Sequence, residues 1–250
     1  METVLVVGAS GNIGVSVIIA ALRTGRKVLA VVRNKEAQEK IIQHVGTKDG
    51  ITFVEANVTN EHGVQGVVDR VKAGELPAFQ HVYAAVGLLD WTSPIQNLDM
   101  TAFRKVMTTS LEANFLAYRA TIPYLLAQGD PKATWTLVTG GAGDYGIAGV
   151  TAVAQGALFS LANVACLENA STNVRFNEVY LAYRVEYDAL CEEVGSSTNR
   201  IKASDFARVY EQILADGGID ACRVSVLGPE DLDALKYAKK LNKKSSWSKE

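Results

Sequence analysis

Residues 3–25, TVLVVGASGNIGVSVIIAALRTG, decide the fold of this chain. The stretch begins as an apolar run rich in β-branched residues, typical of a buried strand, and continues as a helix with Ile13, Val17 and Ala21 on one face. Between them lies the glycine-rich turn GASGNIG, residues 8–14. Glycines let the backbone approach a pyrophosphate, and the N-terminus of the next helix presents free N–H groups and a positive dipole end to phosphates. The sequence therefore predicts a dinucleotide-binding unit, with a tight turn that holds no ligand as the alternative.

The same alternation of strands and helices continues along the chain. Continuous apolar strands separated by helices indicate a parallel sheet covered on both faces. We expect one α/β domain over residues 1–242, followed by a polar tail over 243–250. A long helix is expected over 101–128, an uncharged helix over 150–168, and a last helix opened by Pro229.

The composition argues against several classes of function. The chain has 250 residues, of which 48% are hydrophobic, and a formal net charge of −2 at pH 7. A basic face that would bind nucleic acid or a membrane surface is therefore not expected. Cys166, Cys191 and Cys222 have no short metal-binding spacing, and an odd number without an export signal indicates reduced thiols and a cytoplasmic protein. The three histidines share no ligand spacing either, so no metal site is expected.

The end of the second expected strand indicates which cofactor is bound. NAD sites usually place an acidic residue there for the ribose hydroxyls. Here the strand ends VVRN, residues 31–34, and Arg33 offers a bidentate, charge-assisted partner to the 2′-phosphate of NADP. Ser10 can add a hydroxyl donor. NADP(H) is therefore the predicted cofactor, and the alternative is that Arg33 is only a solvated charge at a strand end.

With these features the chain resembles the short-chain dehydrogenase/reductase family over nearly its whole length. Asn57-Val58 matches the adenine-side motif of the family in position, and Ala84-Ala85-Val86-Gly87 matches its Asn-Asn-Ala-Gly motif. The resemblance implies a Rossmann-type, doubly wound parallel sheet of seven strands and hydride transfer to or from a small molecule. It also implies a homodimer or homotetramer, in which the long helix and the uncharged helix pack against a second subunit. The cofactor contacts expected on these grounds are Gly8, Ser10, Gly11, Asn12, Ile13, Gly14, Arg33, Asn57, Val58, Ala84, Ala85 and Gly87.

The residues at the catalytic positions of the family have all changed. The positions of its Tyr and Lys fall on Thr151 and Gln155, that of its Ser on Gly140, and that of its Asn on Ser110. In the family the Lys lowers the Tyr pKa and the Tyr protonates the developing alkoxide, a general acid step that contributes about 10²–10⁴-fold. A threonine cannot replace this acid near neutral pH, and a glutamine carries no charge. Ordinary ketone reduction by the usual mechanism is therefore not expected.

Asp144 and Tyr145 are the first candidates for a catalytic or substrate-binding role. They are the only ionisable groups in the glycine-rich loop after Gly140, and ligands bind at the carboxyl ends of such strands. The alternative is that Asp144 holds the amides of the turn and that Tyr145 packs beneath the loop.

Three further residues complete the candidate set. Asp90 follows the fourth expected strand, Tyr183 begins the segment that forms a substrate lid in the family, and Ser110 occupies the family's Asn position. Next to Tyr183, Arg184 and Glu186 are interpreted as a solvated ion pair of the lid.

Three functions fit these observations. The first is an NADPH-dependent reductase of a pre-activated substrate, such as an iminium ion or a conjugated carbonyl, in natural-product biosynthesis; an electron-poor carbon takes a hydride without a proton donor. The second is a redox-silent isomerase or cyclase on the same scaffold. The third is a sensor that binds NADP(H) without catalysis. Fold alone does not decide among them.

Overall fold

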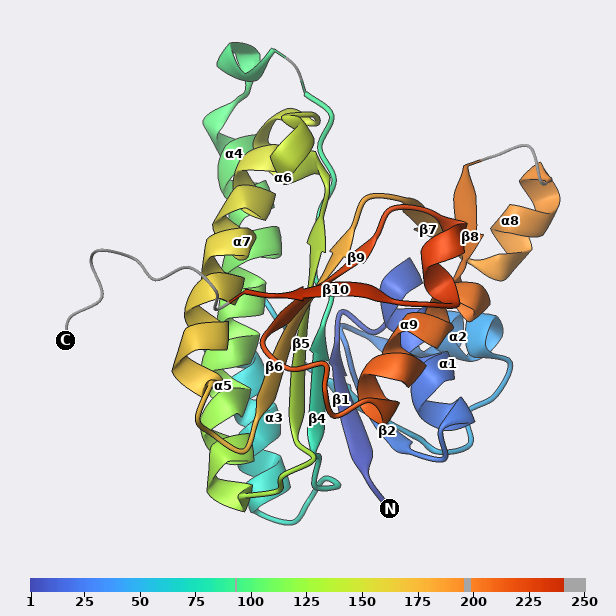
Figure 1. The fold of residues 1–250 in the computed structure, drawn as a ribbon, viewed down its shortest axis with the longest axis vertical. Helices are drawn as coiled ribbons and strands as arrows, with labels where there is room; N and C mark the ends of the chain where they lie inside the picture. Colours follow the sequence, from blue (N-terminus) through green and yellow to red (C-terminus); the bar gives the residue numbers. More distant parts are fainter. Residues whose placement is uncertain (93, 196–198, 241–250) are drawn as a thin grey trace.

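The computed structural model describes residues 1–92, 94–195 and 199–240. One large sheet runs through the molecule (Figure 1). All its neighbouring strands are parallel except the two that come last in the sequence, which are antiparallel. The strands are, in spatial order, β10 (Lys236–Lys239), β9 (Cys222–Val226), β6 (Arg175–Leu181), β5 (Thr134–Gly140), β4 (His81–Ala84), β1 (Thr3–Val7), β2 (Lys27–Val32) and β3 (Ile51–Glu55). The chain leaves β1 toward β2 on one side and returns as β4 on the other. This reversal opens a crevice at the carboxyl ends of the strands, beside the glycine turn.

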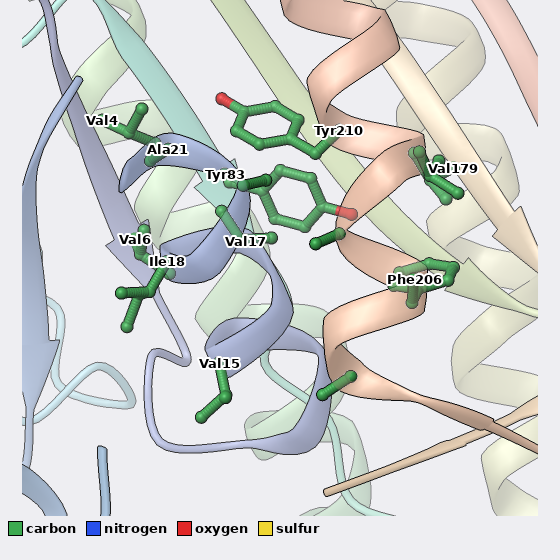
Figure 2. Packing of buried hydrophobic residues seen from close by; sticks show 14 of the residues in the cluster. Val4, Val6, Val15, Val17, Ile18, Ala21, Tyr83, Val179, Phe206 and Tyr210 are labelled. Atoms are coloured by element: carbon green, nitrogen blue, oxygen red, sulfur yellow. The ribbon is translucent and has the colours of Figure 1, made fainter. Parts of the chain in front are cut away.

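Helices cover both faces of the sheet, as Figure 1 shows. Because the strands point alternate side chains to opposite faces, each helical layer packs on its own hydrophobic core. One layer contains α1 (Asn12–Arg23), α2 (Lys35–Val45) and α9 (Ala203–Ala215), and the other contains α3 (Gly63–Lys72), α4 (Met100–Met107), α5 (Ala113–Gln128) and α7 (Gly149–Asn169). In the first core, seen in Figure 2, Tyr83 packs edge-on against Tyr210, with ring centroids 4.7 Å apart.

The sheet has one strand more than the seven expected, because the last element is a strand and not a helix. Pro229 opens a single 3-10 turn, Pro229–Leu232, and the chain then runs antiparallel to β9 as β10. The buried Asp231 carboxylate accepts a hydrogen bond from the Leu227 N–H and pairs with Lys236 at 2.6 Å, which fixes the turn. The acids and lysines that suggested a helix dipole thus stabilise a turn and an exposed edge strand. The tail expected over 243–250 lies outside the described residues.

The expected helix over 101–128 is present but not regular throughout. α4 and α5 are joined by a π-helical segment, Thr108–Glu112. Such segments accommodate an extra residue and are frequent at functional sites. α7, in which Glu168 is the one charged residue, is among the described residues the one helix long and apolar enough to span a membrane. It nevertheless packs against β5, β6 and α4 within the α/β domain.

The chain that follows β6 contains short elements of its own. β7 (Arg184–Glu186) and β8 (Arg200–Lys202) form a two-stranded parallel sheet, and α8 (Asp188–Val194) lies between them in the sequence. In Figure 1 this unit lies on the α1 side of the main sheet. Two further short elements lie in loops between larger ones. The 3-10 turn η1 (Ile95–Asn97) follows β4, and the single helical turn α6 (Ala142–Tyr145) follows β5.

Candidate active site

The glycine turn has glycine where the backbone requires it. Gly8 has a φ of +88°, and a Cβ there would lie 2.7 Å from the Ala85 carbonyl oxygen at the end of β4. A Cβ on Gly14 would lie 2.2 Å from the Gly8 oxygen, so the turn closes directly onto the first turn of α1. Gly11 precedes this helix and leaves its first N–H groups without a side-chain cap, and the first turn carries no acid. The helix end is therefore available to an anion.

A cavity of about 910 Å³ opens beside this turn, and we call it the crevice. Of the expected cofactor contacts, Ile13, Gly14 and Ala84 are not among the residues that line it. Arg33, Lys40 and Lys105 supply positive charge, and no carboxylate lines the crevice. Its lining residues are Gly8, Ala9, Ser10, Gly11, Asn12, Val31, Val32, Arg33, Lys40, Ala56, Asn57, Val58, Thr59, Ala85, Val86, Gly87, Leu88, Lys105, Thr109 and Tyr187.

These residues fit a dinucleotide cofactor with two or more phosphates. Backbone close approach at the glycine turn and the uncapped helix suit a pyrophosphate, and the cations balance its charge. Arg33 is exposed at the end of β2 and forms no ion pair with any described residue. Asn57 accepts hydrogen bonds from the Thr59 N–H (3.0 Å) and hydroxyl (2.8 Å), which fix the turn after β3 at the crevice wall. The crevice can therefore hold NAD or NADP, with Arg33 free to bind a further phosphate.

The loop after β4 is held in place from the π-helical segment. Ser110 is fully buried, and its hydroxyl accepts a hydrogen bond from the Leu88 N–H at 3.0 Å. One turn later Asn114, also fully buried, accepts from the Val86 N–H (3.4 Å) and donates to the Val86 carbonyl (2.7 Å). Ser110 thus supports the crevice wall from behind. Sequence reasoning missed Asn114, although a lone amide in the apolar run ANFLAYRA was a usable signal.

Thr151 and Gln155 both bond to backbone. The Thr151 hydroxyl accepts a hydrogen bond from the Asp90 N–H at 2.8 Å and lies 3.2 Å from the Asp90 carbonyl oxygen, to which it can donate. The Gln155 side-chain oxygen accepts from the Gly140 N–H at 2.6 Å, and a Cβ on Gly140 would touch the Gln155 side chain at 3.4 Å. The two side chains therefore hold the loop after β4 and the end of β5 against α7, and they carry no ionisable proton.

Asp90 and Tyr183 are engaged in local structure. The Asp90 carboxylate accepts the Thr92 N–H at 2.7 Å. Hydrogen bonds from the Thr92 hydroxyl and N–H lower the pKa of Asp90, so it is an anion at neutral pH. Tyr183 packs against the core on the α1 and α9 face of the sheet. Neither residue lines the crevice.

Asp144 and Tyr145 come together with Tyr180 and Arg223, away from the crevice lining. Asp144 lies 3.6 Å from the Arg223 guanidinium and is half-exposed, and Tyr145 is 60% exposed. Burial, reinforced by hydrogen bonding with Asp144 and Tyr145, raises the pKa of Tyr180 to about 12. The expected role of Asp144 at a reacting group is not supported by these contacts, because its carboxylate faces Arg223.

Arg223 belongs to a buried polar cluster that the sequence did not suggest. Its guanidinium lies 4.6 Å from the Phe159 ring centroid and 4.8 Å from that of Tyr180. It also donates two hydrogen bonds, of 2.9 and 3.1 Å, to the fully buried Glu178, which pairs with Lys240 as well. Alternation alone gave no reason to expect a buried carboxylate within β6. The five catalytic candidates are therefore not gathered into one constellation.

The segment that begins at Tyr183, which we call the lid segment, reaches across to the glycine turn. The Asn12 amide donates to the Val185 carbonyl at 3.0 Å and to the Glu186 carboxylate at 2.7 Å. Arg184 and Glu186 form the ion pair that the sequence suggested, with Arg184 Nε 2.5 Å from Glu186 Oε1, although Glu186 is buried rather than solvated. Among the described residues no group of three or more His, Cys, Asp and Glu side chains could hold a metal ion.

Fold and crevice together define a Rossmann-type dinucleotide-binding protein, and residues 2–185 match the short chain dehydrogenase family. The chain belongs to this short-chain dehydrogenase/reductase family of dehydrogenases and reductases. Over 240 residues, 96% of each chain, it is 53% identical to short-chain dehydrogenase/reductase iacG of Pestalotiopsis fici. NAD⁺-bound xylitol dehydrogenase superimposes with a TM-score of 0.73 at 21% identity, over 87% of this chain and 94% of that one. ElxO with NADP bound gives a TM-score of 0.74 at 16% identity, over 88% and 93%.

Proposed function

We propose that this protein binds NADP(H) and reduces a small organic substrate that is already electron-poor, such as an iminium ion or a conjugated carbonyl in natural-product biosynthesis. The observation that carries the proposal is the contrast between the crevice and the family's proton-transfer positions. The phosphate-binding side of the crevice is open and positively charged, whereas Thr151 and Gln155, at the proton-transfer positions, bond to backbone. Binding of a phosphorylated cofactor is supported, and protonation of an alkoxide by a side chain is not.

The preference for NADP(H) rests on charge. The 2′-phosphate carries a charge of about −1.5 to −2 at pH 7, if its second pKa is near 6 as for other phosphate monoesters. Arg33 forms no ion pair within the described part of the chain, and at the end of β2 its planar guanidinium can bind a phosphate bidentately. The crevice has no carboxylate to receive the ribose hydroxyls in the way NAD sites do.

The substrate class follows from the missing acid. When bound, the reduced nicotinamide supplies a hydride. The role of this chain is to bind and orient, since Thr151 and Gln155 carry no ionisable proton and Asp90 is held as an anion in its turn. When an iminium carbon takes a hydride, the product is a neutral amine, and no proton donor is needed.

The test is reduction of defined substrates with labelled cofactor. Purified protein is incubated with NADPH deuterated at either C4 position and with two substrates, an N-alkylated cyclic iminium salt and a cyclic ketone of similar size. We expect deuterium in the amine product and a matching fall in NADPH absorbance, with little conversion of the ketone. Conversion of substrate without NADPH loss would instead establish a redox-silent isomerase or cyclase. Cofactor binding without turnover of a broad iminium and enone panel would favour a sensor.

We also propose that α5 and α7 form the contact with a second copy of the chain. Their outer faces carry apolar side chains that are exposed in the single chain, and soluble monomers seldom leave such patches uncovered. Light scattering should give a multiple of the monomer mass at micromolar concentration, and Leu167→Glu should reduce it, whereas Ile95→Glu at η1 should not. A monomeric wild type would overturn this proposal. The residues concerned are Phe115, Leu126, Val153, Val164 and Leu167, with exposed fractions of 39–69%.

A further inference from the structure

Tyr187 connects the lid segment to the cofactor side of the crevice. Its hydroxyl donates a hydrogen bond of 2.6 Å to the Ser10 carbonyl in the glycine turn. Its ring stacks on the His44 imidazole of α2, with centroids 3.8 Å apart and planes within 5°. The Lys40 ammonium, one helical turn before His44, lies 4.8 Å from the centroid of the same ring. One tyrosine from far along the chain thus touches both the glycine turn and α2.

Lys40 is held by this ring and not by a carboxylate. Within the described residues it forms no ion pair, whereas Lys35 of the same helix lies 3.9 Å from Glu39. A cation over an aromatic face keeps its charge available to a further partner, since the ring neutralises none of it. Burial and the Lys40 ammonium lower the pKa of His44, which keeps the stacked imidazole neutral and adds no competing charge at neutral pH.

Lys40 and Arg33 line the same crevice as Ser10, from α2 and from the end of β2. Because Tyr187 bonds to Ser10 and also lies under Lys40, the ammonium is placed on the glycine-turn side of α2. A dianionic phosphate monoester in this part of the crevice could contact both Arg33 and Lys40. Two cations would bind it more tightly than one, because each adds its own charge-assisted contact.

We propose that Lys40, positioned by Tyr187, forms with Arg33 a two-cation site that selects the 2′-phosphate of NADP(H). This inference rests on the proposed preference for NADP(H). Arg33 and Lys40 are the residues that contact the phosphate, and Tyr187 is a positioning residue that acts through Lys40. Because Tyr187 belongs to the lid segment, the position of the lid and the affinity for the 2′-phosphate are linked, and each influences the other.

The experiment measures the ratio of affinities for NADPH and NADH, and for adenosine 2′,5′-bisphosphate and 5′-AMP, by titration calorimetry. The second pair lacks the nicotinamide and so reports the 2′-phosphate alone. The variants are Lys40→Met, Arg33→Ala, Tyr187→Phe and Tyr187→Leu, with Lys35→Met as the control that removes one charge from the same helix. Circular dichroism verifies that each variant is folded.

We expect Lys40→Met to lower both ratios about tenfold while the NADH and 5′-AMP affinities stay within about twofold, as loss of one charge-assisted phosphate contact implies. Lys35→Met should leave the ratios unchanged. Tyr187→Phe keeps the ring and should keep most of the selectivity, whereas Tyr187→Leu should lower the ratios as Lys40→Met does. The double variant Lys40→Met/Tyr187→Leu should lose no more than either single variant, because both remove the same contact.

The outcomes separate this inference from the proposed function. Ratios near one in the wild type would overturn the preference for NADP(H) itself. Ratios that fall with Arg33→Ala but not with Lys40→Met would leave that preference standing and overturn the two-cation site. Equal weakening of all four nucleotides by Tyr187→Leu would show that Tyr187 only supports the fold of the turn, and would overturn its positioning role.

Discussion

The crevice and the region beside it differ in the state of their polar groups. We call the crevice around the glycine turn the cofactor end, and the region of β4, β5 and the start of α7 the chemical end. At the glycine turn, Arg33 has no partner among the described residues, the end of α1 is uncapped, and no carboxylate intrudes. At the carboxyl ends of β4 and β5 and at the start of α7, three polar side chains are satisfied within the chain. Thr151 bonds to Asp90, Gln155 to Gly140, and Asn114 to Val86.

This difference indicates which function is built into each end. Arg33 is exposed, so water solvates its charge and its guanidinium donors remain available to an anionic ligand. Internally paired groups gain nothing from a transition state, because their hydrogen bonds would have to break first. The cofactor end is thus arranged for a ligand, and the chemical end is arranged to hold its own shape.

The largest effect is expected at the cofactor end, from Gly14→Ala. The added Cβ would lie 2.2 Å from the Gly8 oxygen and 2.7 Å from Ala9 Cα, so the turn must move away from α1. We expect NADPH affinity to fall by about 100-fold or more, since backbone displacement removes several phosphate contacts together. Fluorescence titration measures the affinity.

Gly66→Ala in α3 is the matched control for Gly14→Ala. A Cβ there meets nothing within 4 Å, and alanine favours the helix by about 0.5–1 kcal/mol. NADPH affinity should be unchanged and the free energy of unfolding slightly raised. Normal binding by Gly14→Ala would show that the turn is not the phosphate site.

The next effect concerns the wall between the two ends. Asn114→Ala leaves the buried Val86 backbone groups without their partner, which should lower the free energy of unfolding by about 2–3 kcal/mol. Urea denaturation measures this loss. Ser110→Ala removes only the acceptor for Leu88 and should cost less. Equal, small losses for both would mean that the loop after β4 is held by its apolar contacts instead.

The cofactor end could be predicted from the sequence to a greater extent than the chemical end, for a physical reason. GASGNIG, Arg33 and Asn57 act through local backbone geometry and strand order, which short stretches specify. The structure places residues 8–12, Arg33 and Asn57 around one crevice. The partners of Asp144 lie far along the chain, on β6 and β9, and only the folded sheet brings Tyr180 and Arg223 beside it.

The last strand was missed for a similar reason. DLDALKYAKK carries a helical charge pattern, but pairing with the edge of β9 decided its conformation. Local propensity and tertiary pairing disagreed in this segment, and the pairing prevailed. Asn114 was missed for a related reason. Its partner Val86 lies 28 residues earlier in the chain, in the loop after β4, and only the fold brings the two together.

A moderate effect is expected where the proton-transfer residues of the family would be. Thr151→Val removes the hydrogen bonds of the hydroxyl to the Asp90 backbone, and Gln155→Leu removes the bond to the Gly140 N–H. Each change should lower the free energy of unfolding by about 1–2 kcal/mol. Turnover of an iminium substrate should stay within about tenfold of the wild type, a barrier change of about 1.4 kcal/mol. NADPH affinity should not change. If Thr151→Val abolished turnover in a folded protein, its hydroxyl would be carrying the mechanism, and the comparison of the two ends would fail.

A smaller effect is expected from Asp144→Asn. The carboxylate is half-exposed beside Arg223, and surface pairs of this kind contribute only about 0–1 kcal/mol. Turnover should change by less than about threefold, because Asp144 does not line the crevice. Loss of a charge that stabilises the reacting group would instead reduce turnover by about 10²–10³-fold. Steady-state kinetics with saturating NADPH distinguishes the two results, and the larger one would restore Asp144 to the catalytic centre.

The smallest effect is expected from pH. An enzyme that uses a general acid shows rates that change up to tenfold per pH unit around the pKa of that acid. Here the pKa of Tyr180 is raised to about 12, so its phenol stays neutral below that value, and Asp90, with its lowered pKa, is already an anion at pH 7. Neither group changes charge between pH 7 and 9. Turnover of an N-alkylated iminium salt, whose own charge cannot titrate, should therefore vary by less than about twofold over this range at saturating NADPH. A slope near one log unit per pH unit would reveal an ionising group at the chemical end, and persistence of that slope in Tyr180→Phe would locate it elsewhere than this phenol.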